Sequence, residues 1–374
     1  MNRILLTLLA TAGLCPLAAA QTPHIDAATP PATLVPLQFS TGGRVLVQPD
    51  TSQRAFGSKL TLYQWPGTYF EAAFTGTEVY FRIAGGEQNL HIAVDHNSLL
   101  TLTKPAVGVY RLSGLTPAAH TVRISVISES QGAPDSFSGF AIPPTVTAGV
   151  PPAPRPRQIE FIGDSHTVGY GNTSPSRECT NDQVWSFTDD TKAFGALTAL
   201  HYGADYQINA ISGHGIVRNY GGFAGDPVPV AYPYVLFDKK VIYRDPSWQP
   251  EVIILALGTN DFSTPLSRGE PWKTRDDLHA AYEDTYVSFL QTLRKLHPNA
   301  FLIVWTTGES EIEAEASRVV QQAKAAGETR VALLPIDGLH MDACNYHPSL
   351  ADDRTISQRI IDLIDHTPGV WQGK

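Results

Sequence analysis

Short runs of β-branched and aromatic residues, several of them alternating apolar with polar positions, mark the first part of the chain. Such alternation is typical of β-strands that have one face in the core and the other in water. Glycine and proline punctuate the runs, and no long 3.6-residue period lies between them. The pattern predicts an all-β sandwich within residues 21–142. Its clearest predicted strands are Arg44–Val47, Lys59–Tyr63, Thr77–Ile83 and His120–Val126.

The pattern of hydrophobic and polar positions changes after residues 143–158. This stretch is rich in proline, and we interpret it as an extended linker between two domains. Beyond it, apolar strands alternate with helical segments. This alternation predicts an α/β domain over residues 159–374, with a parallel five-stranded sheet covered by helices. The predicted strands are Ile159–Ile162, Tyr206–Ile211, Val252–Leu257, Phe301–Trp305 and Val331–Leu334.

The clearest predicted helix runs from Arg275 to His297. Its apolar residues recur at helical spacing, so they should lie on one face of the helix. Thr274 and Asp277 have the spacing of a capping box at its start. The residues expected on the buried face are Leu278, Tyr282, Phe289, Leu293 and Leu296.

Composition and charge narrow the class of protein. The chain has 374 residues, of which 43% are hydrophobic, enough for ordinary buried cores. Its formal net charge of −9 argues against a nucleic-acid partner, because phosphate binding needs a basic surface. No segment after the first twenty residues has eighteen unbroken apolar positions. We therefore expect no membrane association after removal of the leader. We also expect the protein to be a monomer.

The first twenty residues have the pattern of an export signal. Arg3 supplies the positive start, an apolar stretch follows, and three alanines before Gln21 suit a cleavage site. The alternative is a lipoprotein signal at Cys15, which the bulky Leu14 before it disfavours. We expect a signal peptide at residues 1–20 and a secreted or periplasmic protein.

Cysteine usage fits that compartment. Of the three cysteines in the chain, Cys15 leaves with the predicted signal. The remaining pair, Cys179 and Cys344, predicts a single disulfide in an oxidising environment. The alternative is two unconnected buried thiols, which export disfavours.

Four chemically distinct groups follow the predicted strands of the α/β domain. Ser165 comes directly after the first strand, Gly213 after the second and Asn260 after the third, whereas His347 lies in the loop that follows the fifth. Because the carboxyl ends of parallel strands meet at one edge of a sheet, we expect these groups to lie close together.

Ester hydrolysis needs such a set. A serine hydroxyl becomes a nucleophile when a base takes its proton, and His347 can be that base for Ser165. The oxyanion of the tetrahedral intermediate needs preorganised donors, which the backbone N–H groups of Ser165 and Gly213 and the side chain of Asn260 can supply. Gly215 is the alternative to Gly213. The sequence thus predicts a serine esterase.

These residues carry a resemblance to a known family. Gly163-Asp164-Ser165, Gly213, Gly258-Thr259-Asn260-Asp261 and His347-Pro348 resemble the four blocks of the SGNH, or GDSL-type, hydrolases. The longer stretches at residues 163–171, 212–216 and 344–348 are similar to carbohydrate esterase family 2. That resemblance implies a flavodoxin-like parallel sheet behind an N-terminal β jelly roll. It also implies an enzyme that removes O-acetyl groups from polysaccharides such as xylan or glucomannan, with no cofactor.

One position departs from the pattern of the family. The superfamily places an aspartate three residues before the histidine, where this chain has Cys344, and family 2 often has one two residues before it, where this chain has Asn345. We expect a serine–histidine dyad in which the carbonyl or side chain of Asn345 orients His347. The alternative orienting groups are two carboxylates of the same loop, Asp337 and Asp342.

Aromatic residues near the predicted site can stack on sugar rings, and Tyr346 and Trp185 are the candidates for substrate binding. Histidines and carboxylates around His347 match no established metal-ligand spacing, so we expect no metal. Two rival functions stay open at this point. One is a lipase or thioesterase on the same scaffold, and the other is a non-catalytic glycan-binding protein on an inactive hydrolase fold.

Overall fold

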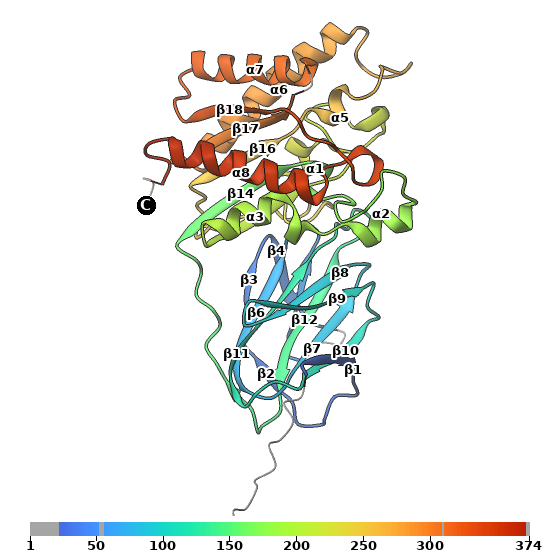
Figure 1. Ribbon diagram of the computed structural model, residues 1–374, viewed down its shortest axis with the longest axis vertical. Coiled ribbons are helices and arrows are strands. Elements are labelled where there is room, and N and C mark those ends of the chain that lie inside the picture. The colour runs from blue at the N-terminus through green and yellow to red at the C-terminus, as the bar shows by residue number, and fades with distance from the viewer. Residues whose placement is uncertain (1–21, 52–55, 309, 372–374) are drawn as a thin grey trace, which may run out of the picture.

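The computed structural model describes residues 22–51, 56–308 and 310–371. The predicted signal peptide at residues 1–20, and with it Cys15, lies outside these ranges. A β-sandwich and an α/β domain are stacked along the long axis of the molecule (Figure 1). Within the described ranges, no helix is both long and apolar enough to cross a bilayer.

The N-terminal domain consists of two antiparallel sheets that enclose an aromatic core, as predicted. In that core Phe70 and Phe137, from opposite sheets, stack with their ring centroids 4.2 Å apart. The first sheet contains, in spatial order, β1 (His24–Ala27), β10 (Gly108–Ser113), β7 (Val79–Gly85), β12 (Asp135–Ile142), β5 (Lys59–Tyr63) and β4 (Val45–Pro49), with β2 (Val35–Leu37) beside β12. The second contains β13 (Thr147–Ala148), β6 (Tyr69–Gly76), β11 (Ala118–Val126), β8 (Asn89–Val94) and β9 (Asn97–Thr103), with β3 (Ser40–Gly42) beside β6.

The C-terminal domain has a parallel five-stranded sheet with the order β15-β14-β16-β17-β18, which confirms the predicted fold class. Alternate residues of β16 point to opposite faces: Ile253 and Leu255 join one core, and Val252 and Ile254 the other. The strands are β14 (Arg157–Gly163), β15 (Ala204–Ala210), β16 (Val252–Ala256), β17 (Phe301–Thr307) and β18 (Val331–Ile336).

Helices cover both faces of this sheet. α6 and α7 pack together on one face, and α3 and α8 on the other (Figure 1). The helices are α1 (Ser165–Val168), α2 (Asn181–Phe187), α3 (Phe194–His201), α4 (Val228–Ala231), α5 (Thr259–Phe262), α6 (Arg275–Leu296), α7 (Ser310–Ala325) and α8 (Leu350–His366). Short 3-10 turns form at η1 (Asp190–Lys192), η2 (Tyr220–Gly222) and η3 (Cys344–Tyr346).

Helix α6 begins at the predicted residue, Arg275, and ends one residue before the predicted end at His297. Thr274 and Asp277 form the reciprocal capping box at its start. Four of the five residues expected on its buried face are buried, but the prediction for Leu296 is wrong, because its side chain is 52% exposed. The helix ends at Leu296, and the residues of the following turn, His297 and Ala300, are buried instead.

The proline-rich segment runs along one side of the sandwich and leads into β14 (Figure 1). It is not wholly irregular, because β13 lies within it and pairs with β6. Strand β14 begins at Arg157, slightly before the position expected from the apolar run.

A buried ion pair joins the two domains. Arg44, next to β4, places Nη2 3.2 Å from Oε1 of Glu160 in the middle of β14, and the two side chains are 2% and 0% exposed. The guanidinium also lies over the rings of Tyr232 and Tyr243, at 4.2 and 4.6 Å from their centroids. The domains therefore share one continuous packed interface at this point.

Candidate active site

Ser165 is the first residue of α1 and follows β14 through a tight turn. Asp164 caps the helix, because its Oδ1 accepts the N–H of His166 at 3.0 Å. Gly163 is required in this turn, since a Cβ there would lie 2.0 Å from Oγ1 of Thr167. The strand and the capped turn thus present the hydroxyl of Ser165 at the carboxyl edge of the sheet.

His347 lies against that hydroxyl, as the order of the blocks predicts. Its Nε2 is 2.8 Å from Oγ of Ser165. Its Nδ1 lies 3.0 Å from the carbonyl oxygen of Cys344 and 3.1 Å from that of Asn345. Carbonyls only accept, so Nδ1 carries the proton and Nε2 is left to accept one from the serine.

The charge state of His347 suits a base. Burial lowers the pKa of this imidazole to about 4, although the two carbonyls oppose the effect. The neighbouring imidazole of His166 packs edge-on against it at 5.4 Å, and burial lowers the pKa of His166 to about 3. Both rings are therefore neutral at neutral pH, and Nε2 is unprotonated.

The geometry distinguishes the groups that could orient His347, which are the carbonyl and the side chain of Asn345 and the carboxylates of Asp337 and Asp342. The carbonyl of Asn345 contacts the imidazole, while its side chain donates a hydrogen bond to the hydroxyl of Tyr170 at 3.2 Å. Of the alternative carboxylates, Asp342 is 62% exposed and forms an ion pair with Arg177 at 2.7 Å. Asp337 packs against the backbone at Gly308.

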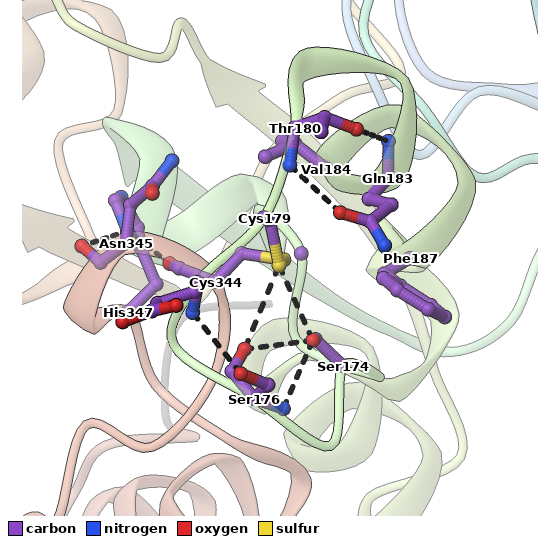
Figure 2. The surroundings of a disulfide bond; sticks show 12 residues. Ser174, Ser176, Cys179, Thr180, Gln183, Val184, Phe187, Cys344, Asn345 and His347 are labelled. Atoms are coloured by element: carbon purple, nitrogen blue, oxygen red, sulfur yellow. Dashed lines mark hydrogen bonds between the residues drawn. A yellow bond between two sulfur atoms is a disulfide. The ribbon is translucent and has the colours of Figure 1, made fainter.

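The predicted disulfide between Cys179 and Cys344 is present. Figure 2 shows it joining the loop that carries Asn345 and His347 to the segment that enters α2. The histidine loop has left-handed backbone at Asn345 (φ 53°) and Tyr346 (φ 60°), a conformation that costs free energy for residues other than glycine. The disulfide therefore holds an unusual loop conformation in place beside His347.

Two of the predicted oxyanion donors have free N–H groups. Within the described part of the chain, neither the backbone N–H of Ser165 nor that of Gly213 has a hydrogen-bond partner. Gly213 adopts φ 84°, which favours glycine, and its carbonyl accepts the N–H of Tyr220 at 2.8 Å. Asn260 differs, because its Nδ2 already donates to Oδ2 of Asp164 (3.1 Å) and to the carbonyl of His214 (3.0 Å).

The loop after β15 is shaped by Asp261. Its carboxylate accepts three backbone N–H groups, each at 2.9 Å, from Ile216, Val217 and Arg218. A Cβ at Gly215 would lie 2.3 Å from both the carbonyl of Arg218 and Oδ2 of Asp261. Gly215 therefore permits close packing inside the loop, while Gly213 lines the cavity that contains Ser165 and His347.

A cavity of about 1000 Å³ opens over Ser165 and His347. Tyr346 lines it and is 68% exposed, and Cζ of Arg177 lies 4.9 Å from the centroid of its ring. Trp185 lies instead in a neighbouring cavity of about 200 Å³, where Lys104 packs over its ring. The residues of the catalytic cavity that sequence reasoning missed include Glu129, Gln131, Tyr170, Arg177, Tyr220 and Phe223.

Comparison with known proteins places this site in a family. Residues 161–356 match the GDSL-like lipase/acylhydrolase family, and residues 54–154 match the N-terminal domain of carbohydrate esterase 2. An acetylxylan esterase / glucomannan deacetylase from Cellvibrio japonicus (strain Ueda107) is 40% identical over 339 residues, which cover 90% of this chain and 93% of that protein. The chain belongs to the GDSL-like hydrolases of the carbohydrate esterase 2 type.

Solved structures agree with this assignment. One carbohydrate esterase, whose active site displays divergent catalytic and non-catalytic binding functions, has a TM-score of 0.83 at 39% identity and covers 90% of this chain and 100% of its own. A family two carbohydrate esterase from Clostridium thermocellum, in complex with cellohexaose, has a TM-score of 0.75 at 25% identity and covers 89% and 100%.

Some residues that line the cavity over Ser165 and His347 could not be identified from the motifs of the sequence alone. Tyr170 lies within the stretch at residues 163–171 but was not singled out as a site residue, and its ring lies 4.3 Å from that of His347. Glu129 and Gln131 come from the N-terminal domain, after β11. Nothing in the sequence around these two residues indicates a site, because only the folded interface brings them to the sheet edge.

Proposed function

We propose that this carbohydrate esterase is an exported O-deacetylase of xylan- or glucomannan-type polysaccharides that uses a Ser165–His347 dyad. The observation that carries the proposal is the 2.8 Å contact between Oγ of Ser165 and Nε2 of His347 inside an open cavity. The relative from Cellvibrio japonicus supports the substrate class. The N-terminal signal pattern and the disulfide support export.

The proposed reaction begins when Oγ of Ser165 attacks the acetyl carbonyl carbon and Nε2 of His347 takes the hydroxyl proton. The N–H groups of Ser165 and Gly213 stabilise the oxyanion. The side chain of Asn260 joins them by sharing the N–H that it donates to the carbonyl of His214. His347 then returns its proton to the departing sugar oxygen, leaving an acetyl-serine. Nε2 of His347 then takes a proton from a water molecule, which attacks the acetyl carbonyl carbon. The bond from that carbon to Oγ of Ser165 breaks, His347 returns the proton to Oγ, and acetate leaves.

A panel of esters tests the proposal. Acetate release should be measured from acetylated xylan, glucomannan and peptidoglycan, and hydrolysis from aryl acetate and a long-chain aryl ester. We expect release from xylan or glucomannan and none from the Ser165→Ala variant. Activity confined to the long-chain ester would favour a lipase or thioesterase. Release that survives Ser165→Ala would refute the serine mechanism, and glycan binding without any release would favour the binding protein.

The lowered pKa of His347 leads to a pH prediction. The base works only when neutral, so kcat/KM should fall as pH drops through the pKa of the free enzyme, about 4 rather than the ordinary 6.5. We expect kcat/KM for an aryl acetate to stay nearly constant from pH 7 to about 5.5. Circular dichroism at each pH controls for acid unfolding. An acid limb with its midpoint at 6.5 or above, in folded enzyme, would contradict the assignment of the base.

A further inference from the structure

Both backbone groups of Ser212 are held by side chains of the other domain. The N–H of Ser212 donates to Oε2 of Glu129 at 2.9 Å. Nε2 of Gln131 donates to the carbonyl oxygen of Ser212 at 3.0 Å and to Oε1 of Glu129 at 3.2 Å. Glu129 and Gln131 belong to the sandwich, whereas Ser212 follows β15 of the α/β domain. Three residues from two domains thus form one hydrogen-bonded cluster in the wall of the catalytic cavity.

The carbonyl that Gln131 contacts belongs to the same peptide unit as the N–H of Gly213. A trans peptide is planar, so its C=O and N–H point in opposite directions. A donor that fixes the oxygen of Ser212 therefore also fixes the direction of the N–H of Gly213. A hydrogen bond to the carbonyl polarises the amide as well, which strengthens the N–H as a donor.

The other side of Gly213 is fixed too, because its carbonyl accepts the N–H of Tyr220. The loop that carries Gln131 is itself anchored. Oγ of Ser130 donates to the carbonyl of Ala133 at 2.7 Å, and Nε2 of Gln64 donates to the carbonyl of Gln131 at 3.4 Å. A glycine at φ 84° would otherwise be free to rotate its N–H away from the cavity.

We propose that Gln131, held by Glu129, is a positioning residue that aims and polarises the N–H of Gly213 toward the oxyanion, so that the sandwich domain completes the active site. The proposal rests on the proposed esterase mechanism and deepens it. Gln131 acts on the transition state through the peptide of Ser212 and Gly213. Its loss should therefore lower kcat and leave KM nearly unchanged.

Three variants test this role with an aryl acetate as substrate. Gln131→Met keeps the size of the side chain but removes the donor, whereas Gln131→Lys keeps a donor to the carbonyl and a partner for Glu129. Gln48→Ala, an exposed glutamine on β4 of the same domain, is the matched control. We expect Gln131→Met to lower kcat about tenfold, less than the loss of a whole oxyanion donor. Gln131→Lys should recover most of kcat, and Gln48→Ala should match the wild type.

A second readout separates positioning from general damage. Phenylboronic acid forms a tetrahedral adduct with a catalytic serine, so its inhibition constant should rise in Gln131→Met by about the factor that kcat falls, with KM within about twofold. Unchanged kcat in Gln131→Met, a change in KM alone, or no recovery in Gln131→Lys would overturn the proposal. Loss of the esterase mechanism itself would show differently, as wild-type activity that survives Ser165→Ala.

Discussion

Replacing His347 by alanine is expected to lower kcat/KM by about 10⁴-fold or more, while Asn345→Gly lowers it by no more than about tenfold. The two variants differ because the imidazole is the proposed base, whereas Asn345 contacts that imidazole through its carbonyl. A backbone carbonyl survives the substitution of its side chain. Glycine is the appropriate replacement because residue 345 has φ 53°, where alanine would add strain of its own.

The measurement is initial-rate kinetics with an aryl acetate and with acetylated xylan. Ser165→Ala is the matched reference, because nucleophile and base act as a unit and their losses should be similar in size. Thermal unfolding of each variant shows whether the fold is intact. An Asn345→Gly loss as large as that of His347→Ala would mean that the side chain of Asn345, rather than the carbonyls, orients the base.

Much of this site could be predicted because each of its functional groups lies in a short local sequence motif. Ser165, Gly213 and Asn260 each follow a strand directly, and buried parallel strands are easy to recognise as apolar runs. Once the strands are known, sheet geometry brings their carboxyl ends together. The disulfide was predictable for a different reason, since Cys179 and Cys344 are an isolated pair after the predicted signal.

The remaining features depend on backbone conformation and on contacts between distant residues. The carbonyls of Cys344 and Asn345 that contact Nδ1 of His347 lie in a loop where Asn345 and Tyr346 adopt left-handed backbone, which the sequence motifs did not indicate. Trp185 has the right chemistry for a platform, but the packing of α2 places it in the neighbouring cavity. Gln131 reaches the site across 81 residues of sequence, through an interface between domains.

The interface that brings Gln131 to the site also contains the ion pair with the largest expected effect on stability. Arg44→Met should lower the free energy of unfolding by about 3–5 kcal/mol, because it leaves the buried carboxylate of Glu160 without its countercharge. Neutral donors remain around Glu160, from Asn209 at 2.6 Å, Tyr232 at 2.8 Å and Trp248 at 3.2 Å. They stabilise the carboxylate but bring no positive charge, so they offset only part of its desolvation. Nε2 of His297 lies 3.8 Å from the carboxylate, and burial lowers the pKa of that imidazole, which disfavours its charged form.

Denaturant unfolding of Arg44→Met beside Arg111→Met isolates the contribution of burial. Arg111 makes the same type of ion pair with Glu78 at 2.5 Å, but its side chain lies at the surface of the sandwich. Solvent screens that pair, so the same substitution there should cost about 1 kcal/mol or less. Equal losses at the two sites would show that the Arg44–Glu160 pair contributes no more than a surface pair. A larger loss at Arg44, accompanied by a fall in kcat, would show that interdomain packing also maintains the catalytic cavity, because the same interface holds Gln131 against Ser212.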